Sequence, residues 1–494
     1  MTSTLPWLSL SIIVPIISGI LVLIFGRDER ADYTRKMSLV GAIVSFLVTL
    51  PILTGFDSTT AEMQFVENVP WIDAFNVAYH LGVDGISVWF VLLTAFITVI
   101  VVIAGWEVIT SRVAQYMAAF LILSGLMVGV FVALDGLLFY VFFEATLIPM
   151  YIIIGVWGGP NRVYAAFKFF LYTLLGSLLT LVAFIYLYTQ TGTFDIATWQ
   201  EHPLGMTPQL FIFFALFAAF AVKVPMWPVH TWLPDAHVEA PTGGSIVLAA
   251  IMLKLGAYGF LRFSLPIAPD ASQSMAGLMI ALSLIAVIYI GLVAIVQDDM
   301  KKLVAYSSVA HMGFVTLGFF MFNTAGVEGA IIQMISHGFV SGAMFMCIGV
   351  LYDRLHTRRI ADYGGVINVM PKFATFFVLF SMANSGLPAT SGFVGEFYVI
   401  LGAVDYNFWI GLLTATALIL GASYSLWMAK RVIYGKITSP AVKAMPDINK
   451  REFTILALLA VMTLVMGVYP HLITDMIHVS AQHLLEHVAQ SKLM

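Results

Sequence analysis

Residues 222–237 read VKVPMWPVHTWLPDAH and interrupt an apolar segment with three prolines, Pro225, Pro228 and Pro234. Proline removes a backbone N–H donor and clashes with the preceding helical turn, so a regular helix cannot continue through this stretch. In lipid, such irregular backbone persists only where protein or water satisfies its polar groups. The stretch therefore predicts a membrane helix that is broken at Pro225 and Pro228.

A second interruption lies in residues 383–397, which read ANSGLPATSGFVGEF and contain Gly386, Pro388 and Gly392. Glycine and proline again predict a broken helix, here at Pro388. Interrupted helices at corresponding places in two halves of a chain indicate an ion or substrate pathway built on internal repeats. Because glycine and proline are also common in ordinary membrane helices, either break alone is weaker evidence than the pair.

The composition predicts that lipid is the solvent for most of the surface. The chain has 494 residues, of which 60% are hydrophobic and 10% are charged, whereas soluble domains carry about 25% charged residues. Its one cysteine, Cys347, excludes a disulfide within the chain and any all-cysteine iron–sulfur or zinc site. The sequence contains no Gly-rich nucleotide loop between a strand and a helix. We therefore expect no metal or cofactor site in this chain, and no binding to nucleic acid.

Apolar runs long enough to cross the bilayer recur along the whole chain. A helix needs about 20 residues to span roughly 30 Å of hydrocarbon. The first run, residues 5–25, precedes every Lys and Arg, so we expect a spanning helix there and not a cleavable signal peptide. Runs of this length predict about fourteen spans, at 5–25, 33–54, 84–106, 113–133, 135–157, 163–189, 209–229, 243–264, 275–297, 301–322, 326–350, 372–400, 406–434 and 452–475.

The positive charges fit this set of spans. With both termini on the outer side, most of the 23 Lys and Arg residues fall in inner loops. Only Arg262 and Lys492 fall outside, while Lys223 and Lys254 lie within apolar runs. An excess of Lys and Arg in inner loops is typical of membrane proteins. A missed span would have reversed the side of every later loop and so distributed these residues over both sides. The outer loop 55–83 is acidic, and we expect small folded elements there.

Six ionisable residues fall well inside the predicted spans, and none of them is an arginine. They are Glu144, Lys223, Lys254, His311, His337 and Glu396. A charge at the bilayer centre costs roughly 2.5–3.5 kcal/mol, so the acids and lysines together cost on the order of 10 kcal/mol if unpaired. The usual functions of such residues are proton relays, ion paths and ligand counter-ions. Because Glu, Lys and His all gain and lose protons, the set predicts a proton relay.

Two of these residues suggest a switchable pair. Burial disfavours the charged forms of Lys and Glu, whereas an opposite charge nearby favours them. A buried lysine whose carboxylate partner moves therefore takes up and releases a proton. We expect Glu144 and Lys223 to form such a pair if their helices are neighbours.

Each residue also has a purely structural alternative. His311 and His337 are compatible with hydrogen-bonded packing positions, and the two glutamates with neutral caps of neighbouring helix groups. Lys254 could extend its ammonium toward the interface, although it lies deep within its predicted span. These alternatives must hold for all six residues at once, which favours the relay.

The other acidic and histidine positions predict local structure and not a metal site. His230, His237 and Glu239 are spaced H-x6-H-x-E with an intervening proline, which is not the spacing of metal ligands on a helix. Asp84 and Asp135 stand at the starts of predicted spans. An acidic residue there is typical of a helix N-terminal cap.

Four stretches resemble the antiporter-like subunits of respiratory complex I, the proton-translocating NADH:quinone oxidoreductase. They are VKVPMWPVHTWLPDAHVEAPTGGS (222–245), LVAYSSVAHMGF (303–314), QMISHGF (333–339) and FYVFFEATLIPMY (139–151). The resemblance runs over nearly the whole chain, and together the stretches are far more specific than one short motif.

The resemblance implies an all-α polytopic membrane fold of about fourteen helices, with two inverted five-helix repeats that each contain a broken helix. It divides the chain into three N-terminal helices in 1–112, a first repeat in 113–264, a second, inverted repeat in 275–434 and a last helix in 435–494.

The resemblance also implies the relay positions. They are Glu144, Lys223, Lys254, His311 and His337, followed by a residue on the second broken helix. One branch of the family carries glutamate at that last position, whereas the L and N types and the sodium/proton antiporter relatives carry lysine; this chain has Glu396. The L type also has a long lateral helix after the core, which we do not expect here.

The implied function is proton translocation as a subunit of the NADH-oxidising enzyme, with no redox centre in this chain. FMN, iron–sulfur clusters and quinone then belong to partner subunits, with L- and N-type antiporter-like subunits on either side in a bacterial inner (plasma) membrane. Two alternatives remain: a subunit of a multi-chain sodium/proton antiporter, and a structural membrane-arm subunit whose buried charges serve packing.

Overall fold

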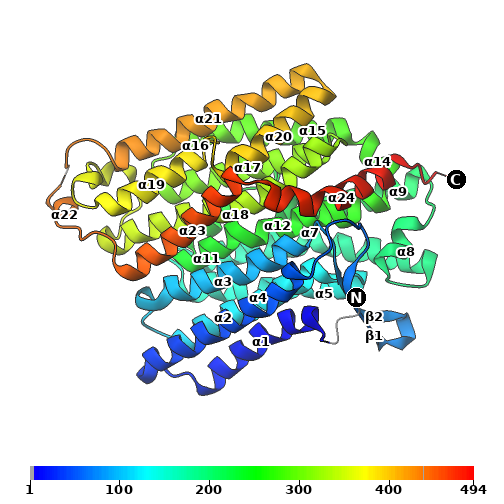
Figure 1. The fold of residues 1–494 in the computed structure, drawn as a ribbon, viewed down its shortest axis with the longest axis horizontal. Coiled ribbons are helices and arrows are strands. Elements are labelled where there is room, and N and C mark those ends of the chain that lie inside the picture. Colours follow the sequence, from blue (N-terminus) through cyan, green and yellow to red (C-terminus); the bar gives the residue numbers. More distant parts are fainter. Residues whose placement is uncertain (1–4, 438, 494) are drawn as a thin grey trace.

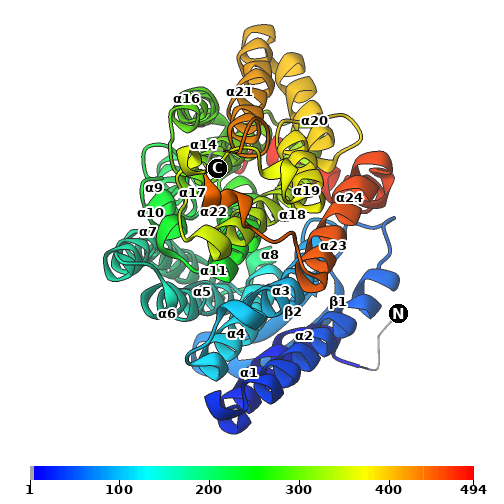
Figure 2. The same cartoon turned by 90° about the vertical axis from the view of Figure 1, so that its left-hand side faces the viewer.

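The computed structural model describes residues 5–437 and 439–493. Helices that run side by side form one bundle (Figures 1 and 2). Within the described residues, 12 helices are long and apolar enough to cross a membrane, or 13 if one bent pair counts as a span. The chain is therefore a mostly helical, polytopic membrane protein, as the composition predicts.

The first half of the bundle contains nine helices before the first break and α10 after it. They are α1 (Trp7–Phe25), α2 (Ala31–Thr54), α3 (Val88–Val108), α4 (Val113–Val132), α5 (Gly136–Ala145), α6 (Leu147–Trp157), α7 (Arg162–Thr191), α8 (Ile196–Glu201), α9 (Met206–Lys223) and α10 (Trp232–Glu239). The predicted cap at the start of α5 is confirmed, because the Asp135 carboxylate accepts hydrogen bonds from the N–H groups of Leu137 and Leu138.

The second half begins with a span that contains α11 (Thr242–Val247), α12 (Leu253–Gly259) and α13 (Leu265–Ile267), joined by π-helical turns at Leu248–Met252 and Phe260–Ser264. A third π-helical turn, Ala286–Ile290, separates α15 from α16. The remaining helices are α14 (Pro269–Ser274), α15 (Ala276–Ile285), α16 (Gly291–Ile295), α17 (Met300–Phe319), α18 (Thr324–Leu355), α19 (Pro371–Ala383), α20 (Ser391–Tyr406), α21 (Phe408–Val432), α22 (Pro440–Lys443), α23 (Lys450–Val468) and α24 (His471–Ala489).

Length and composition do not confirm the predicted count of about fourteen spans. Helix α17 corresponds to the predicted span 301–322 and has 20 residues, but its lysines, serines and histidine make it less apolar than the 12. The predicted span 372–400 is divided by its break into α19, with 13 residues, and α20, with 16. Neither piece alone reaches the length of a crossing.

The acidic loop 55–83 holds the small folded element that the sequence predicts. Strand β1 (Gln64–Ile72) pairs antiparallel with β2 (Val77–Val83), so a two-stranded hairpin accompanies the helices of this otherwise all-α fold. The hairpin and both ends of the described chain lie at one end of the bundle, whereas α22 lies at the other (Figure 1). These two ends are called the hairpin end and the opposite end below.

The centre of the bundle consists of helices that are buried on all sides. The spanning windows of Thr242–Ile267 and of α18 are both entirely buried, whereas only about a third or less of those of α1, α2 and α21 is buried. Helix α18 packs against α3, α11, α17, α20 and α23. In cross-section, α1 and α2 lie at one edge of the molecule and α20 and α21 at the opposite edge (Figure 2).

The first predicted break is present where the prolines place it. Helix α9 ends at Lys223 and α10 begins at Trp232, so Pro225 and Pro228 both lie in the irregular segment between them. The indole Nε1 of Trp232 donates to the carbonyl of Val222 at 2.9 Å. This bond satisfies a carbonyl that the interrupted helix leaves without its usual partner.

The second predicted break is also present, between α19 and α20, and it contains Pro388. Gly386 has a positive φ of 73° there, a conformation that glycine adopts without the Cβ clash of other residues. The Asn384 side chain donates to Ser425 Oγ of α21 at 2.9 Å. Side chains of a neighbouring helix therefore contribute to holding the interrupted segment.

The C-terminal segment contains a helix that the sequence did not reveal. After α23, Tyr469 and Pro470 end the helix and α24 begins at His471. Helix α24 packs on α18, where His478 Nδ1 lies 2.5 Å from Glu328 Oε1. Its mixture of polar and apolar residues hides it from a search for continuous apolar runs.

A buried ion pair joins two spans at the hairpin end. Arg262 Nη2 lies 2.7 Å from Asp84 Oδ2, and both side chains are less than a tenth exposed. Asp84 also accepts from the N–H groups of Ile86 and Ser87 just before α3, so its predicted capping role is confirmed. Arg262 Nε donates in addition to the Tyr258 hydroxyl at 3.0 Å. The sequence did not predict the ion pair.

Substitution of Asp84 by Asn is expected to destabilise the protein strongly, because it leaves the Arg262 guanidinium buried without its counter-charge. Removing one partner of a buried pair costs about 3–5 kcal/mol. Asp32→Asn is the matched control, since the Asp32–Lys36 pair at 2.6 Å is exposed on both sides and exposed pairs contribute little. The midpoint of thermal unfolding in detergent measures both variants, and equal shifts would contradict the assigned importance of the buried pair.

Candidate functional site

The structure brings four of the six predicted residues into one line of contacts at the centre of the bundle. They are Lys254 on α12, His337 on α18, His311 on α17 and Glu396 on α20. All four side chains are at most 5% exposed. Buried groups of this kind are hydrogen-bonded or charge-paired in stable proteins, and the contacts below supply those partners.

Lys254 is held at the start of the line. Its Nζ lies 2.6 Å from His337 Nδ1 and 2.5 Å from the carbonyl oxygen of Ala249, which belongs to the π-helical turn before α12. A lysine ammonium offers three donors and no acceptor, so both contacts suit its charged form. π-helical turns recur at functional sites in membrane and soluble helices. The lysine is too deep and too well held to extend to the interface.

The two histidines connect α18 with the second broken helix. The His337 and His311 rings have centroids 5.7 Å apart. His311 Nε2 in turn lies 3.2 Å from Glu396 Oε1. His337 Nε2 and His311 Nδ1 have no hydrogen-bond partner within the protein. Lys254, His337, His311 and Glu396 thus form a continuous series of titratable groups.

Glu396 occupies a cramped position beside the second break. Gln333 Nε2 donates to its Oε1 at 3.3 Å, and a Cβ atom at Gly386 would lie 2.5 Å from its Oε2. A small cavity of about 10 Å³, with Tyr424 in its wall, opens between His311 and Glu396 and has room for a single water molecule. Gln333 and Tyr424 are neutral, so a search for buried charges did not find them.

Glu144 and Lys223 lie apart from this line and from direct contact with each other. Lys223 Nζ lies 4.6 Å from the centroid of the Phe143 ring, where a cation is attracted by the aromatic face. Neither Lys223 Nζ nor Glu144 Oε1 has a hydrogen-bond partner. Their charges interact through space, so the expected pair is an electrostatic one and not a hydrogen-bonded ion pair.

Helix α12 packs tightly on α9 at the first break. A Cβ atom at Gly256 would lie 2.8 Å from Lys223 Cβ and 2.9 Å from the Phe220 carbonyl oxygen. Lys254 stands two residues before Gly256, so the two lysines belong to helices in direct backbone contact. Their ammonium groups have different partners, Phe143 for Lys223 and His337 for Lys254.

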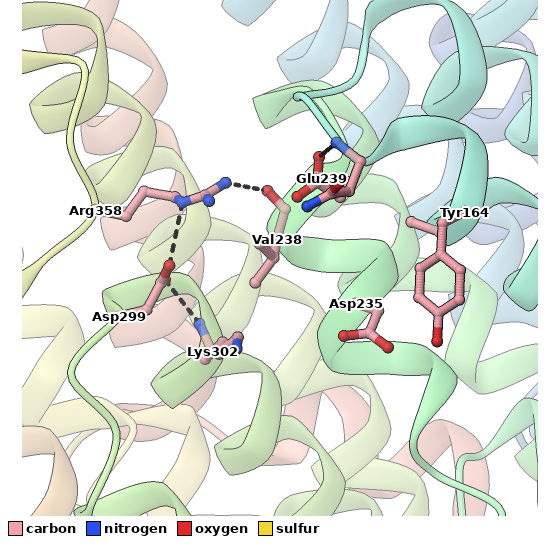
Figure 3. Close-up of a pocket in the computed structure, with 9 residues that line it drawn as sticks. Tyr164, Asp235, Val238, Glu239, Asp299, Lys302 and Arg358 are labelled. Carbon is pink, nitrogen blue, oxygen red and sulfur yellow. Dashed lines mark hydrogen bonds and ion pairs between the residues drawn. The ribbon is translucent and has the colours of Figure 1, made fainter.

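A polar cavity of about 320 Å³ lies at the opposite end of the bundle. It is lined by residues of α7, α10 and the start of α17, with Arg358 from the loop that follows α18 (Figure 3). Arg358 Nε lies 3.1 Å from Asp299 Oδ2, and its Nη1 donates to the Val238 carbonyl at 2.5 Å. Lys168 Nζ pairs with Asp235 at 2.6 Å nearby. Aqueous ions and protons can reach buried groups only through polar openings of this kind.

The histidines of the first interrupted stretch do not converge on a metal position. Glu239 is used locally, since its Oε2 accepts from the N–H of Asn161 at 2.9 Å. The His237 ring stacks on Phe345 at 4.3 Å, and the His230 ring faces Tyr306 at 6.5 Å. Among the residues that the structure describes, no group of three or more His, Cys, Asp or Glu side chains is arranged to hold a metal ion.

Sequence comparisons identify close relatives. Residues 133–421 match the family described as NADH:quinone oxidoreductase/Mrp antiporter, TM. NADH-quinone oxidoreductase subunit M of Rhodobacter capsulatus is 54% identical over 475 residues, which cover 93% of this chain and 92% of that protein. NADH-ubiquinone oxidoreductase chain 4 of Arabidopsis thaliana is 47% identical over 477 residues, 96% of each protein.

Solved structures show the same fold. A chain of respiratory complex I from Thermus thermophilus with bound NADH superimposes with a TM-score of 0.90 at 30% sequence identity, covering 98% of this chain and all of that chain. A chain of the Mrp complex from Dietzia sp. DQ12-45-1b superimposes with a TM-score of 0.83 at 24% identity, covering 97% of this chain and 51% of that one. The second likeness concerns the fold alone.

Substitution of Gly386 by Ala is expected to displace the Glu396 carboxylate as well as strain the backbone. A non-glycine residue in a left-handed conformation costs about 1–2 kcal/mol. Gly435→Ala is the matched control, because Gly435 also has a positive φ, 92°, but its Cβ would meet nothing within 4 Å. We expect a larger fall in thermal stability for Gly386→Ala than for Gly435→Ala, measured on the purified protein. Equal falls would show that the contact with Glu396 is relaxed at no cost.

Proposed function

The chain belongs to the family of NADH:quinone oxidoreductase and Mrp antiporter membrane proteins, and from this premise we propose that it is the subunit M type, which translocates protons in NADH:quinone oxidoreductase. The single observation that carries the mechanism is the buried series Lys254, His337, His311 and Glu396, whose members contact one another across three helices and the second broken one. Glu396 fits this type, because the lysine-bearing types differ at that position.

We further propose fourteen crossings, in which α17 and the α19–α20 pair are added to the 12 helices that qualify by length and composition. Helix α17 has the length of a crossing, and α19 with α20 together form a broken one. Residues 113–264 and 275–434 are then two inverted repeats, each with one interruption. Both termini lie on the outer side with the hairpin, and the inner membrane of a bacterium is the location.

The relay moves protons by short transfers between fixed groups. A proton passes from Lys254 Nζ to His337 Nδ1 over 2.6 Å. The step between the rings uses the two nitrogens without protein partners, His337 Nε2 and His311 Nδ1, and one bridging water or a small ring movement closes it. His311 then passes a proton from Nε2 to Glu396, which releases it toward the outer side.

Glu144 and Lys223 regulate when a proton enters the relay. While Glu144 is charged, it stabilises the Lys223 ammonium through space. When a neighbouring subunit displaces or neutralises Glu144, that stabilisation is lost and Lys223 releases its proton toward Lys254. Moving one charge against the membrane potential costs about 2.3 kcal/mol per 100 mV. This energy comes from redox chemistry in partner subunits, which hold FMN, iron–sulfur clusters and the quinone site.

The partners are other membrane subunits of the complex, with L- and N-type antiporter-like subunits on either side. A sodium/proton antiporter subunit is the second candidate function, supported by the fold shared with the Mrp complex chain and opposed by Glu396 in place of lysine. A purely structural subunit is the third. Normal pumping after separate Lys223→Ala and Lys254→Ala changes would favour it.

Purification of the tagged chain from its own membranes in mild detergent tests the assignment. We expect NADH oxidation, flavin and iron–sulfur signals to co-purify with it, because redox partners must accompany a complex I subunit. A stable membrane complex that lacks flavin and clusters after gentle extraction would favour the antiporter assignment.

Substitution of Glu144 by Gln is expected to leave the complex assembled but to cut proton translocation and coupled NADH oxidation. The amide keeps the size of the side chain and removes the charge that acts on Lys223. Glu62→Gln is the control, since Glu62 is exposed in the acidic loop near the hairpin. Proton uptake by inverted vesicles, normalised to the amount of assembled complex, measures the effect. Full pumping by the Glu144 variant would exclude its proposed role.

A further inference from the structure

His237 on α10 is a buried base that the relay described above does not use. Its side chain is 0% exposed, and neither ring nitrogen has a hydrogen-bond partner. The ring stacks almost parallel on Phe345, with 8° between the two planes. A buried polar group without a partner costs about 1–3 kcal/mol. An apolar ring would fill the same stack without that cost, so packing alone does not account for histidine here.

The groups around His237 are basic, and two of them are members of the relay. His237 interacts electrostatically with Lys254 and with Lys301, and also with His337. Lys254 and His337 are the first two groups of the relay, 2.6 Å apart. The packing agrees: the ring lies on Phe345 of α18, the helix that also carries His337, and Ser245 Oγ, at the start of the span that holds Lys254, donates to the His237 carbonyl at 3.1 Å.

Lys301 connects this position with the polar cavity at the opposite end. It is 5% exposed, and its Nζ donates to the Ala240 carbonyl at 2.8 Å. Its charge interacts with Arg358, Asp299 and Glu239, which line the 320 Å³ cavity (Figure 3).

The chain itself also brings His237 to the cavity. Val238 and Glu239, the next two residues along α10, are both in the cavity wall (Figure 3). His237 is turned away from that wall, into the core against Phe345 of α18. A buried base one residue from a polar opening has the position that a group passing protons inward requires.

We propose that His237 carries protons between Lys301 and Lys254, so that Lys254 is supplied from the polar cavity at the end opposite the hairpin. The inference rests on the proposed function, since it assigns one more proton-carrying residue to the same relay. It also gives Lys254 a supply that does not pass through Lys223, whose ammonium lies against Phe143 and contacts no relay group.

The transfer needs no reagent other than the proton. An N–H bond of the Lys301 ammonium breaks, and a proton binds one ring nitrogen of His237 through a bridging water, because neither ring nitrogen contacts a lysine directly. The N–H bond at the other ring nitrogen breaks, and a proton binds the neutral amine of Lys254 through a second bridging water. The imidazole is cationic only between the two steps, and nothing is oxidised or reduced. Lys301 regains its proton from water in the cavity, and Lys254 passes its own to His337.

The test uses the intact complex in inverted vesicles, with NADH-driven proton uptake as the measurement. His237→Gln keeps polarity but cannot carry a proton in this way, and His237→Phe keeps the stack on Phe345. We expect uptake to fall about tenfold in whichever variant assembles, since proton-transfer groups are worth 10²–10⁴-fold and water can replace part of this. The variants should also alter how the uptake rate depends on the pH of the medium outside the vesicles.

Phe345→Leu is the matched control, because it disturbs the same stack and leaves the imidazole in place. It should keep its uptake rate and pH dependence within about twofold of the unmodified complex. Wild-type uptake in an assembled His237→Gln complex, or an equal loss in Phe345→Leu, would overturn the inference.

A double variant tests whether the two bases act in series. Lys301→Gln should reduce uptake as much as His237→Gln does, and the double variant should be no slower than the slower single one, because groups on one route are not additive. Multiplied losses would overturn the inference. Lys254→Ala distinguishes failure of the relay from failure of the role of His237. Normal pumping by both Lys254→Ala and His237→Gln complexes would reject the relay itself. Loss of pumping in Lys254→Ala together with normal pumping in His237→Gln would reject only the role of His237.

Discussion

The constraint on which the structure depends is that a bilayer offers no water to its polar groups. Every interrupted turn and buried charge must find partners in the protein or in internal water. The two broken helices meet this condition with side chains, as Trp232 does for the Val222 carbonyl and as Asn384 does with Ser425 of α21. The breaks therefore lie among packed helices, and the helices that face lipid, such as α1 and α2, are continuous.

The interruptions also decide where charge is tolerated. The C-terminal end of a helix is partially negative and favours a cation, and Lys223 is the last residue of α9. The N-terminal end is partially positive, and Glu396 stands in the second turn of α20. The first break thus lies next to Lys223, and the second lies close to Glu396.

The sequence predicts the parts of this arrangement that depend on composition along the chain. Apolar runs located most of the spans, prolines located both breaks, and the rarity of charge in lipid singled out Lys254 and Glu396. Contacts that form only when distant segments pack together could not be predicted from the sequence. Gln333 is neutral and Arg262 stands near the end of a span, so neither signals its partner in the sequence. Helix α24 was missed because an amphipathic helix has no continuous apolar run.

Several buried polar atoms have no hydrogen-bond partner within the protein. Among the described residues they include atoms of Glu144, Lys223, His237, His311 and His337, which are the proposed proton-carrying groups and their control. Each such atom costs free energy that a fully paired core avoids. Other buried atoms without partners, such as Arg35 Nε, Ser124 Oγ and Arg431 Nη2, lie on helices that hold no relay residue. Within the relay, the free ring nitrogens of His337 and His311 belong to adjacent groups, which is where a path requires them, because a group that is permanently hydrogen-bonded at every atom cannot hand a proton on.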